Sequence, residues 1–280
     1  MKQVTIIIGI IFIMLILLMY LFQRQLIYFP SHEVPKLQDY QANDMMVITL
    51  DTQGGLVLNS WYKPAKTDQP TILYLHGNAG HIGGRIKLAR QFMDAGFGLL
   101  LLEYRGYGGN KGRPSEKGLY EDGRAGMRFL HQQGIESKQI VLYGESLGSG
   151  VATKLAVENS ICGVILQSPY TSLSDLARFH YPWLWFNPWD SFDSINRIQE
   201  IHAPLLILHG LKDDVVPYSQ GQLLFQKASK PKKMLSFILE DHHTMWNAPN
   251  FSKNIIDFID VHCKNKSIIK PITPKFPGAS

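Results

Sequence analysis

Hydrophobic residues in this chain gather into short apolar runs that are separated by stretches of mixed polarity. Apolar runs of this length, bounded by turn residues, are typical of buried strands. They occupy residues 71–75, 98–103, 139–143, 163–166, 205–208 and 233–239. The stretches between them predict helices at about 84–95, 116–132 and 151–158, and Ser115 is the expected N-cap of the second.

Strands that alternate with helices in this way predict an α/β fold. We expect a mostly parallel central sheet of about eight strands, with right-handed crossovers and helices on both faces. Two earlier runs, 45–50 and 56–62, lie on either side of a turn at Gly54-Gly55. They are expected to form an antiparallel pair at one edge of the sheet.

The N-terminal apolar run is longer than the others. Val4 to Phe22 carries no charge, and a helix with a rise of about 1.5 Å per residue would cross most of a hydrocarbon layer of about 30 Å. Tyr20 and Arg24 stand where interfacial anchor residues usually lie. A cleaved signal peptide is the alternative, but no Ala-x-Ala-like site follows the run. We therefore expect a single-pass transmembrane anchor over residues 1–24.

The charges beside this helix give only a weak indication of its orientation. Lys2 and the N-terminal amine precede the helix and Arg24 follows it, so the two sides are nearly balanced under the positive-inside rule. A short N-terminus usually stays in the cytoplasm. This would place the rest of the chain on the non-cytoplasmic side of the membrane, which is the periplasm in a bacterial cell.

The 280 residues leave enough chain after the anchor for one large domain with its own core. We expect this domain over residues 25–263, with a small lid at about 170–200 and a tail without regular structure at 264–280. The lid region is dense in aromatic residues, which suits a cover over an acyl pocket or a surface that contacts lipid. Packing of these rings on the sheet is the alternative. The sequence does not indicate an oligomeric state.

Composition and charge exclude several classes of protein. A hydrophobic content of 45% and a charged content of 18% suit a globular protein with a membrane segment and do not suit a disordered chain. The net charge of +5 is spread along the chain, apart from residues 230–233, and does not indicate nucleic-acid binding. The two cysteines, Cys162 and Cys263, imply no disulfide framework, and Cys162 is expected to be buried.

The motif with the clearest chemical meaning is Gly144-Glu145-Ser146-Leu147-Gly148. It follows the strand predicted at 139–143 and precedes a helix, so its Gly-x-Ser-x-Gly pattern falls on a strand-to-helix turn. Such a turn strains the backbone of Ser146 and projects its hydroxyl away from the sheet, and the glycines leave room for closely approaching backbone. Ser146 is therefore a candidate nucleophile. The amide of Leu147, at the start of the helix, is a candidate donor to an oxyanion.

A candidate acid and a candidate base follow the later strands. Asp213 follows the strand at 205–208 and is preferred as the carboxylate, with the adjacent Asp214 as the alternative. His242 follows the last strand and is preferred as the base, with His243 as the alternative, because the chain order Ser, Asp, His is one that such sites use. A His-His pair beside acids also occurs in metal sites. No third ligand appears at metal spacing, so we expect neither a metal nor a cofactor.

All of these residues follow parallel strands, whose carboxyl ends meet at one edge of a sheet. We expect His242 to take the proton of Ser146, Asp213 to stabilise the imidazolium, and Ser146 to form an acyl-enzyme. A second oxyanion donor is expected in the loop after the strand at 71–75. It is the amide of Asn78 or, alternatively, that of Ala79.

Together these motifs resemble the α/β-hydrolase superfamily and, more narrowly, its single-pass membrane-anchored serine hydrolases, over roughly residues 25 to 262. The residues that carry the resemblance are 76–80, 104–108, 112–120, 144–148, 168–172, 209–210, Asp213 and 216–217. The resemblance implies the α/β-hydrolase fold and activity on esters or thioesters, and eukaryotic members include protein depalmitoylases. Two positions depart from the family. Glu103 stands where Asp is usual before Tyr-Arg-Gly, and His243 stands where Asn often follows the catalytic histidine.

The preferred interpretation is therefore a membrane-anchored serine hydrolase for carboxylic esters or thioesters with an acyl or lipid-like group. A serine peptidase on the same scaffold is a second interpretation, although no subsite for a free amine or a peptide is evident. A catalytically idle, membrane-tethered binding domain is a third. The complete set of serine, aspartate and histidine argues against it.

Overall fold

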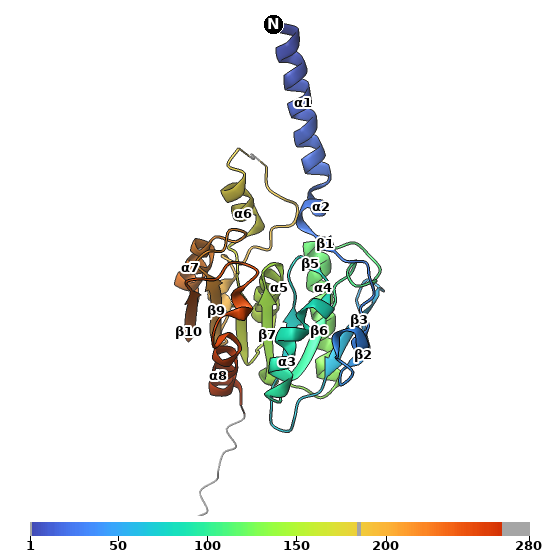
Figure 1. Ribbon diagram of the computed structural model, residues 1–280, viewed down its shortest axis with the longest axis vertical. Coiled ribbons are helices and arrows are strands. Elements are labelled where there is room, and N and C mark those ends of the chain that lie inside the picture. Colours follow the sequence, from blue (N-terminus) through green and yellow to red (C-terminus); the bar gives the residue numbers. More distant parts are fainter. Residues whose placement is uncertain (1, 184–185, 265–280) are drawn as a thin grey trace, which may run out of the picture.

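A mixed sheet of eight strands organises the part of the chain that the computed structural model describes, residues 2–183 and 186–264. Its strand order is β10-β9-β8-β7-β4-β6-β3-β2, and every neighbouring pair from β10 to β6 runs parallel. The strands are β2 Met46–Asp51, β3 Val57–Lys63, β4 Thr71–Leu75, β6 Gly98–Leu102, β7 Ile140–Glu145, β8 Gly163–Gln167, β9 Leu205–Gly210 and β10 Lys232–Phe237. The predicted α/β fold with a mostly parallel sheet is confirmed (Figure 1).

The antiparallel strands lie at one edge of this sheet, as predicted. β2 pairs antiparallel with β3, and β3 pairs antiparallel with β6. The turn between β2 and β3 contains Gly55 at φ +75°, a backbone conformation that favours glycine. Each of these two strands begins one residue later than the sequence pattern predicts.

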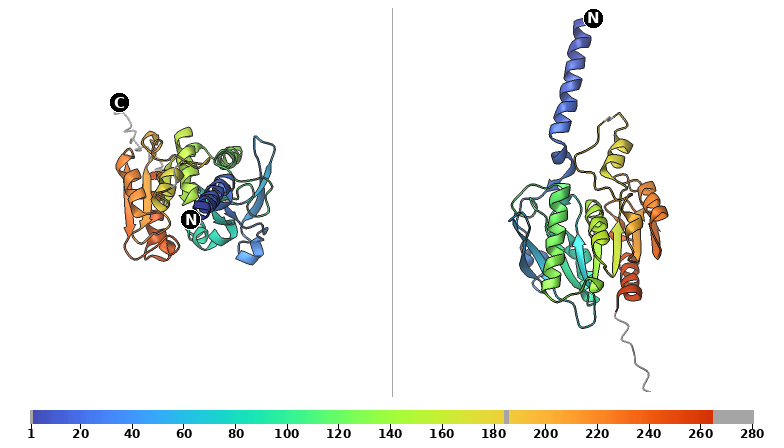
Figure 2. Two further views of the ribbon diagram at one scale, coloured as in Figure 1. Left: turned by 90° about the horizontal axis from the view of Figure 1, so that it is seen from above. Right: turned by 180° about the vertical axis from the view of Figure 1, so that it is seen from behind.

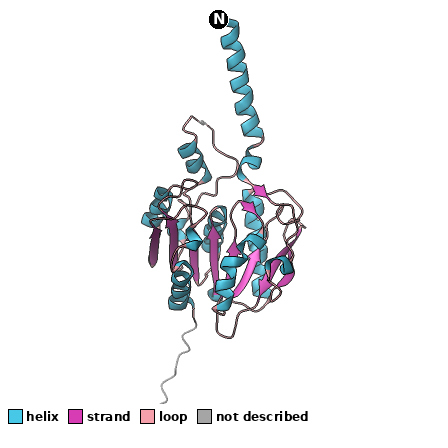
Figure 3. Ribbon diagram, in the orientation of Figure 1, coloured by secondary structure: helices cyan, strands magenta, loops and turns pink. Residues whose placement is uncertain are grey.

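Helices cover both faces of the sheet, as Figures 1 and 2 show from opposite sides. On one face lie α4 Glu116–Gln132, α5 Leu147–Glu158 and α7 Tyr218–Lys227, and on the other lie α3 Ile86–Asp94 and α8 Phe251–Cys263. Short 3-10 helices occur at Leu37–Tyr40, Ile82–Arg85, Ser137–Gln139, Ile198–Glu200 and Met245–Asn247. In Figure 3 the strands therefore lie between two layers of helices.

The helix α4 begins and ends where the sequence pattern predicts. Its N-cap is Ser115, whose Oγ accepts a hydrogen bond from the amide of Gly118 at 3.1 Å. A side-chain acceptor at this position satisfies one of the amide groups that the first turn of a helix leaves unpaired.

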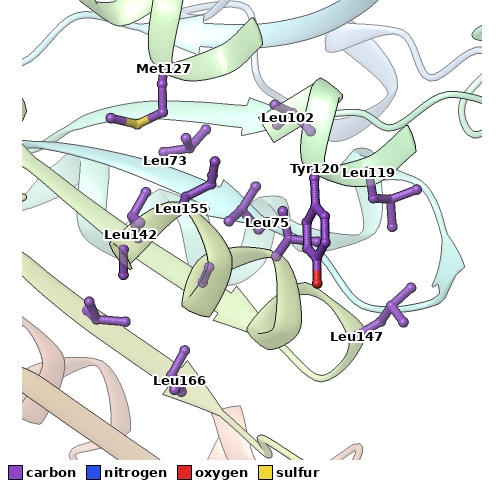
Figure 4. Close-up of a cluster of buried hydrophobic side chains, with 14 of the residues drawn as sticks. Leu73, Leu75, Leu102, Leu119, Tyr120, Met127, Leu142, Leu147, Leu155 and Leu166 are labelled. Carbon is purple, nitrogen blue, oxygen red and sulfur yellow. The ribbon is translucent and has the colours of Figure 1, made fainter. Parts of the chain in front are cut away.

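The central strands are buried on both faces, which explains why most of their side chains are apolar. In β4, Leu73 and Leu75 belong to the hydrophobic cluster under α4 and α5, whereas Ile72 and Tyr74 belong to the cluster under α3 and α8. Figure 4 shows the first cluster, in which Leu73 and Leu75 lie among side chains of the covering helices. The two clusters fix the sheet, and so fix the positions of the loops at its carboxyl edge.

The N-terminal helix α1 (Lys2–Leu21) stands clear of the domain, and none of its residues is buried (Figure 1). Among the described residues it is the one helix that is long and apolar enough to cross a membrane. A short helix α2 (Gln23–Ile27) and a two-residue strand β1 (Phe29–Pro30) then bring the chain onto the domain. β1 pairs in parallel with β5 (Ala79–Gly80) in a separate small sheet.

The region predicted as a lid contains the helix α6 (Leu173–His180), which lies on the same side of the domain as α1 (Figure 1). The ring of Tyr20 lies 5.3 Å from that of Phe186 and 5.3 Å from that of Trp189, centroid to centroid. Residues 184–185 of this region and 265–280 of the predicted tail lie outside the described residues. The predicted domain boundaries stay predictions.

The two cysteines form a disulfide, which the sequence analysis did not anticipate. Cys162 and Cys263 are bonded, with their Cα atoms 5.5 Å apart, and Cys162 is buried as expected. The bond joins the residue before β8 to the last residue of α8. The two cysteines are 101 residues apart in the sequence, and no local pattern connects residues at that separation.

Candidate active site

Ser146 occupies the turn between β7 and α5 in a strained backbone conformation. Its φ is 49° and its ψ is −115°, values that are rare for a residue other than glycine. The glycines on either side are required by close packing. A Cβ at Gly144 would lie 2.6 Å from the Cα of Ser149, and a Cβ at Gly148 would overlap the carbonyl oxygen of Leu75. The turn therefore presents the serine hydroxyl at the carboxyl edge of the sheet.

The structure brings Ser146, His242 and Asp213 into one chain of hydrogen bonds. His242 Nε2 lies 3.0 Å from Ser146 Oγ, and His242 Nδ1 lies 2.8 Å from Asp213 Oδ2. Because a carboxylate accepts hydrogen bonds, Nδ1 carries the ring proton and Nε2 is free to accept the serine proton. Of the two adjacent pairs that the sequence left open, this chain of hydrogen bonds contains the preferred residues, Asp213 and His242.

The carboxylate of Asp213 is buried and is held by several donors. Its Oδ1 accepts hydrogen bonds from the amides of Val215 at 3.1 Å and Val216 at 2.7 Å. Burial raises the pKa of Asp213, whereas hydrogen bonds from His209 and His242 lower it. The resulting pKa lies well below the ordinary value of aspartate, so the group remains an anion beside the imidazole at neutral pH.

A turn after the last strand determines which histidine faces the serine. Asp241 Oδ1 accepts hydrogen bonds from the amides of His243 at 2.8 Å and Thr244 at 2.9 Å. In this turn the side chain of His242 points to Ser146, and that of His243 is exposed. Within residues 2–183 and 186–264, no cluster of three His, Cys, Asp or Glu side chains is close enough to hold a metal ion.

Two backbone amides close to Ser146 are candidate donors to an oxyanion. Asn78 and Leu147 line a cavity together with Ser146, and Leu147 is the first residue of α5. Among the hydrogen bonds of the described residues, neither amide N–H has an acceptor. Unpaired amides at a helix N-terminus and in an adjacent loop are the usual donors to a tetrahedral oxyanion.

Two cavities meet at Ser146 and differ in character. The larger, about 430 Å³, is mostly apolar, and its lining includes Leu26, Ile27, Leu147, Leu173, Leu176 and Val216. The smaller, about 330 Å³, is more polar, and its lining includes Asn78, Arg85, Gln167, His242, His243 and Trp246. Ser146 thus lies between a mostly apolar cavity and one that has a larger share of charged and polar side chains in its lining.

A buried ion pair that the sequence did not reveal joins the loop after β4 to the turn at Ser146. Arg85 Nη2 lies 3.0 Å from Glu145 Oε1, and Tyr74 OH donates to Glu145 Oε2 at 2.8 Å. Burial raises the pKa of Glu145, whereas the guanidinium of Arg85 and the hydrogen bond from Tyr74 lower it, and the net pKa is below the ordinary value. The partners are 60 residues apart in the sequence, and no motif links them.

Comparisons with known proteins give both sequence relatives and structural neighbours. A family model described as serine aminopeptidase, S33, matches residues 66–188. An uncharacterized protein of Mycobacterium tuberculosis is 41% identical over 75% of this chain and 77% of its own length. The alpha/beta hydrolase domain-containing protein WAV2 of Arabidopsis thaliana is 31% identical over 68% of this chain and 69% of its own. The lysophosphatidylserine lipase ABHD12 of Danio rerio is 35% identical over 62% and 51%.

The fold is shared with solved structures at much lower sequence identity. A Pyrococcus furiosus esterase, PF2001, superposes with a TM-score of 0.71 at 18% identity and covers 85% of this chain and 98% of its own. Similarity at that identity concerns the fold alone. The Mycobacterium tuberculosis protein and WAV2, at more than 30% identity over more than two thirds of their own length, share descent with this chain as well.

Proposed function

The chain belongs to the α/β-hydrolase superfamily, and from this membership we propose that it is a membrane-anchored serine hydrolase that cleaves carboxylic esters or thioesters. The observation that carries the proposal is the chain of hydrogen bonds from Ser146 through His242 to Asp213. A buried aspartate, an oriented imidazole and a strained serine are the groups that acyl transfer through a serine nucleophile requires.

The proposed reaction has two steps. His242 Nε2 accepts the proton of Ser146 Oγ as the oxygen attacks the acyl carbon, and the charge of Asp213 stabilises the resulting imidazolium. The imidazolium then gives its proton to the departing alcohol or thiol, which leaves the acyl group on Ser146. Water then attacks the acyl carbon and gives a proton to His242. The bond from the acyl carbon to Ser146 Oγ breaks, the acid leaves, and His242 returns the proton to Ser146 Oγ. In both tetrahedral stages the amides of Asn78 and Leu147 would donate to the oxyanion.

An acyl or lipid-like substrate suits the two cavities. An acyl chain would occupy the apolar cavity of about 430 Å³, and a polar leaving group would occupy the smaller one. The relative ABHD12 is named a lysophosphatidylserine lipase, and the structural neighbour PF2001 is named an esterase. These names support an ester with an acyl chain as the substrate of this chain too.

A peptidase is the second candidate, because the matching family model is described as serine aminopeptidase. Labelling with a fluorophosphonate probe, followed by mapping of the modified residue, tests the nucleophile. We expect the label on Ser146 and turnover of p-nitrophenyl esters across a chain-length series, with little turnover of aminoacyl amides. Faster turnover of the amides would favour the peptidase. A folded protein that takes no label would favour an idle binding domain.

We also propose that α1 anchors the protein with its catalytic domain outside the cytoplasm. Its 20 residues are mostly apolar and carry no charge after Lys2, and the disulfide Cys162–Cys263 suits an oxidising compartment such as the bacterial periplasm. In a bacterial host, a reporter that is active only outside the cytoplasm is expected to be active when fused at the C-terminus. A reporter that works only in the cytoplasm is the control, and its activity would overturn this orientation. Intact mass will show whether residues 2–24 are retained, as an anchor requires.

A further inference from the structure

Residues 27–31, the linker between α2 and the domain, contact the loop that holds one proposed oxyanion donor. We propose that this linker is a positioning element of the active site, which holds the oxyanion loop (residues 77–80) where the amide of Asn78 meets the substrate. The proposal rests on the function proposed above. It assigns to the segment beside the anchor a catalytic contribution in addition to tethering.

Asn78 is bound to the linker through both its side chain and its backbone. Its Nδ2 donates to the carbonyl of Ile27 at 3.1 Å, and its carbonyl accepts from the amide of Phe29 at 2.9 Å. The amide of Ser31 donates to the carbonyl of Gly80 at 2.9 Å, so that β1 and β5 pair along their full length. The linker therefore contacts the oxyanion loop at two positions, Asn78 and Gly80.

The oxyanion loop depends on such partners because its own backbone is permissive. Gly77 and Gly80 flank its centre, and Gly80 has a φ of +80°. On the domain side, Tyr107 OH donates to the carbonyl of Asn78 at 2.8 Å, and Arg85 Nη1 donates to the carbonyl of Ala79 at 2.9 Å. The linker supplies further hydrogen bonds to Asn78 and Gly80, so the loop is held from both the domain and the linker.

The linker is itself held in place. Tyr28 is 4% exposed, and its hydroxyl donates to Asp190 Oδ2 at 3.0 Å. Arg24 Nε donates to the same oxygen at 2.9 Å. Ile27, the first residue of the linker, lines the larger cavity, and so does Leu26, which precedes the linker. One short segment therefore forms part of the cavity wall and holds the loop that would stabilise the oxyanion.

Holding the loop matters because an oxyanion donor acts only at short range. A donor must lie within about 3 Å of the developing charge, and a misplacement of about 1 Å in a catalytic group typically costs about 100-fold in rate. The ground-state substrate makes weaker use of this donor. Loss of the linker contact should therefore lower kcat and leave KM little changed.

A pair of substitutions at Phe29 isolates the contact in the full-length protein. Phe29→Pro removes the amide that donates to Asn78, and Phe29→Ala keeps it. The ring is 53% exposed, so either change loses little packing, and Tyr28 at φ −109° and ψ 125° is compatible with a following proline. We express kcat per active site, as titrated with a fluorophosphonate. For a short soluble ester, Phe29→Pro is expected to lower kcat about 10- to 100-fold relative to the wild type and to change KM by no more than about threefold. Phe29→Ala should stay within about twofold of the wild type.

A second readout separates positioning from general damage. Affinity for a trifluoromethyl ketone, which forms an oxyanion on the serine, should fall in parallel with kcat/KM in Phe29→Pro. Affinity for the matching secondary alcohol, which forms none, should not change. Equal losses for both ligands, or a wild-type kcat per titrated site, would overturn the proposal. The proposed function would still stand if Ser146→Ala is inactive.

If Phe29→Pro yields no titratable sites, Asn78→Ala decides the question. This change removes the side-chain bond to Ile27 and keeps the backbone amide of residue 78. The same loss of kcat per titrated site is expected. Asn59→Ala, at an exposed position of β3, is the matched control and should behave as the wild type. An unchanged kcat in Asn78→Ala would refute a positioning role of the linker.

Discussion

Replacement of Ser146 by alanine is expected to lower kcat/KM for ester hydrolysis by about 10⁵- to 10⁶-fold. The proposed mechanism depends on the serine oxygen, because His242 and Asp213 act only through its proton. Without it, the oxyanion donors and the cavities remain, and they supply only the small residual acceleration that such sites keep when the nucleophile is lost. Steady-state rates with a p-nitrophenyl ester, on protein whose circular dichroism matches the wild type, will measure the loss.

Ser149→Ala is the matched control for this experiment. Ser149 lies on α5 three residues after the proposed nucleophile, and its Oγ is buried without a hydrogen-bond partner among the described residues. Removal of an unsatisfied buried hydroxyl costs little. We therefore expect activity within about threefold of the wild type. Hydrolysis that survives in Ser146→Ala at more than a few per cent would mean that another group is the nucleophile.

The fold and the general location of the site were predictable because the signal is local. Ser146 and Asp213 each follow a strand that is buried on both faces and mostly apolar, and such strands are evident from a window of five or six residues. The chain order of strands and helices then fixes a parallel sheet, and a parallel sheet collects its carboxyl-end loops at one edge.

The choice between adjacent residues was not predictable, because it depends on the geometry of a turn. His242 and His243 have the same chemistry and follow the same strand. They differ because Asp241 accepts hydrogen bonds from two backbone amides. The resulting turn directs the imidazole of His242 inward and leaves that of His243 exposed. Asp213 is distinguished from Asp214 in the same way, by the amides of the following residues.

Contacts between segments that are distant in the sequence also could not be predicted from local patterns. Asn78 meets Ile27 across 51 residues, and Arg85 meets Glu145 across 60. The strands β1 and β5 have two residues each, which is too short for any periodicity to appear. The sequence therefore did not predict these long-range contacts or the short strands β1 and β5, which hold the loops around the site.

The two histidines offer a second experiment with a large effect. His242→Ala is expected to lower kcat/KM by about 10⁵- to 10⁶-fold, because no other base lies within hydrogen-bonding distance of Ser146 Oγ among the described residues. His243→Ala should stay within about threefold of the wild type. His243 lines the smaller cavity and packs against His242, with ring centroids 5.3 Å apart, but among the hydrogen bonds of the described residues it is His242 that bonds Ser146 Oγ. The comparison uses the same substitution at adjacent positions, so general effects of the change cancel.

The double variant Ser146→Ala/His242→Ala tests whether the two groups act as one unit. If His242 works only by accepting the serine proton, its removal from a chain that already lacks Ser146 should not lower the residual activity further. The double variant should therefore be no less active than Ser146→Ala alone, within about threefold. A further loss of 100-fold or more would show that His242 assists the residual reaction independently, for example by activating water directly. A large effect of His243→Ala, with His242→Ala active, would place the base on the other imidazole and contradict the geometry of the turn.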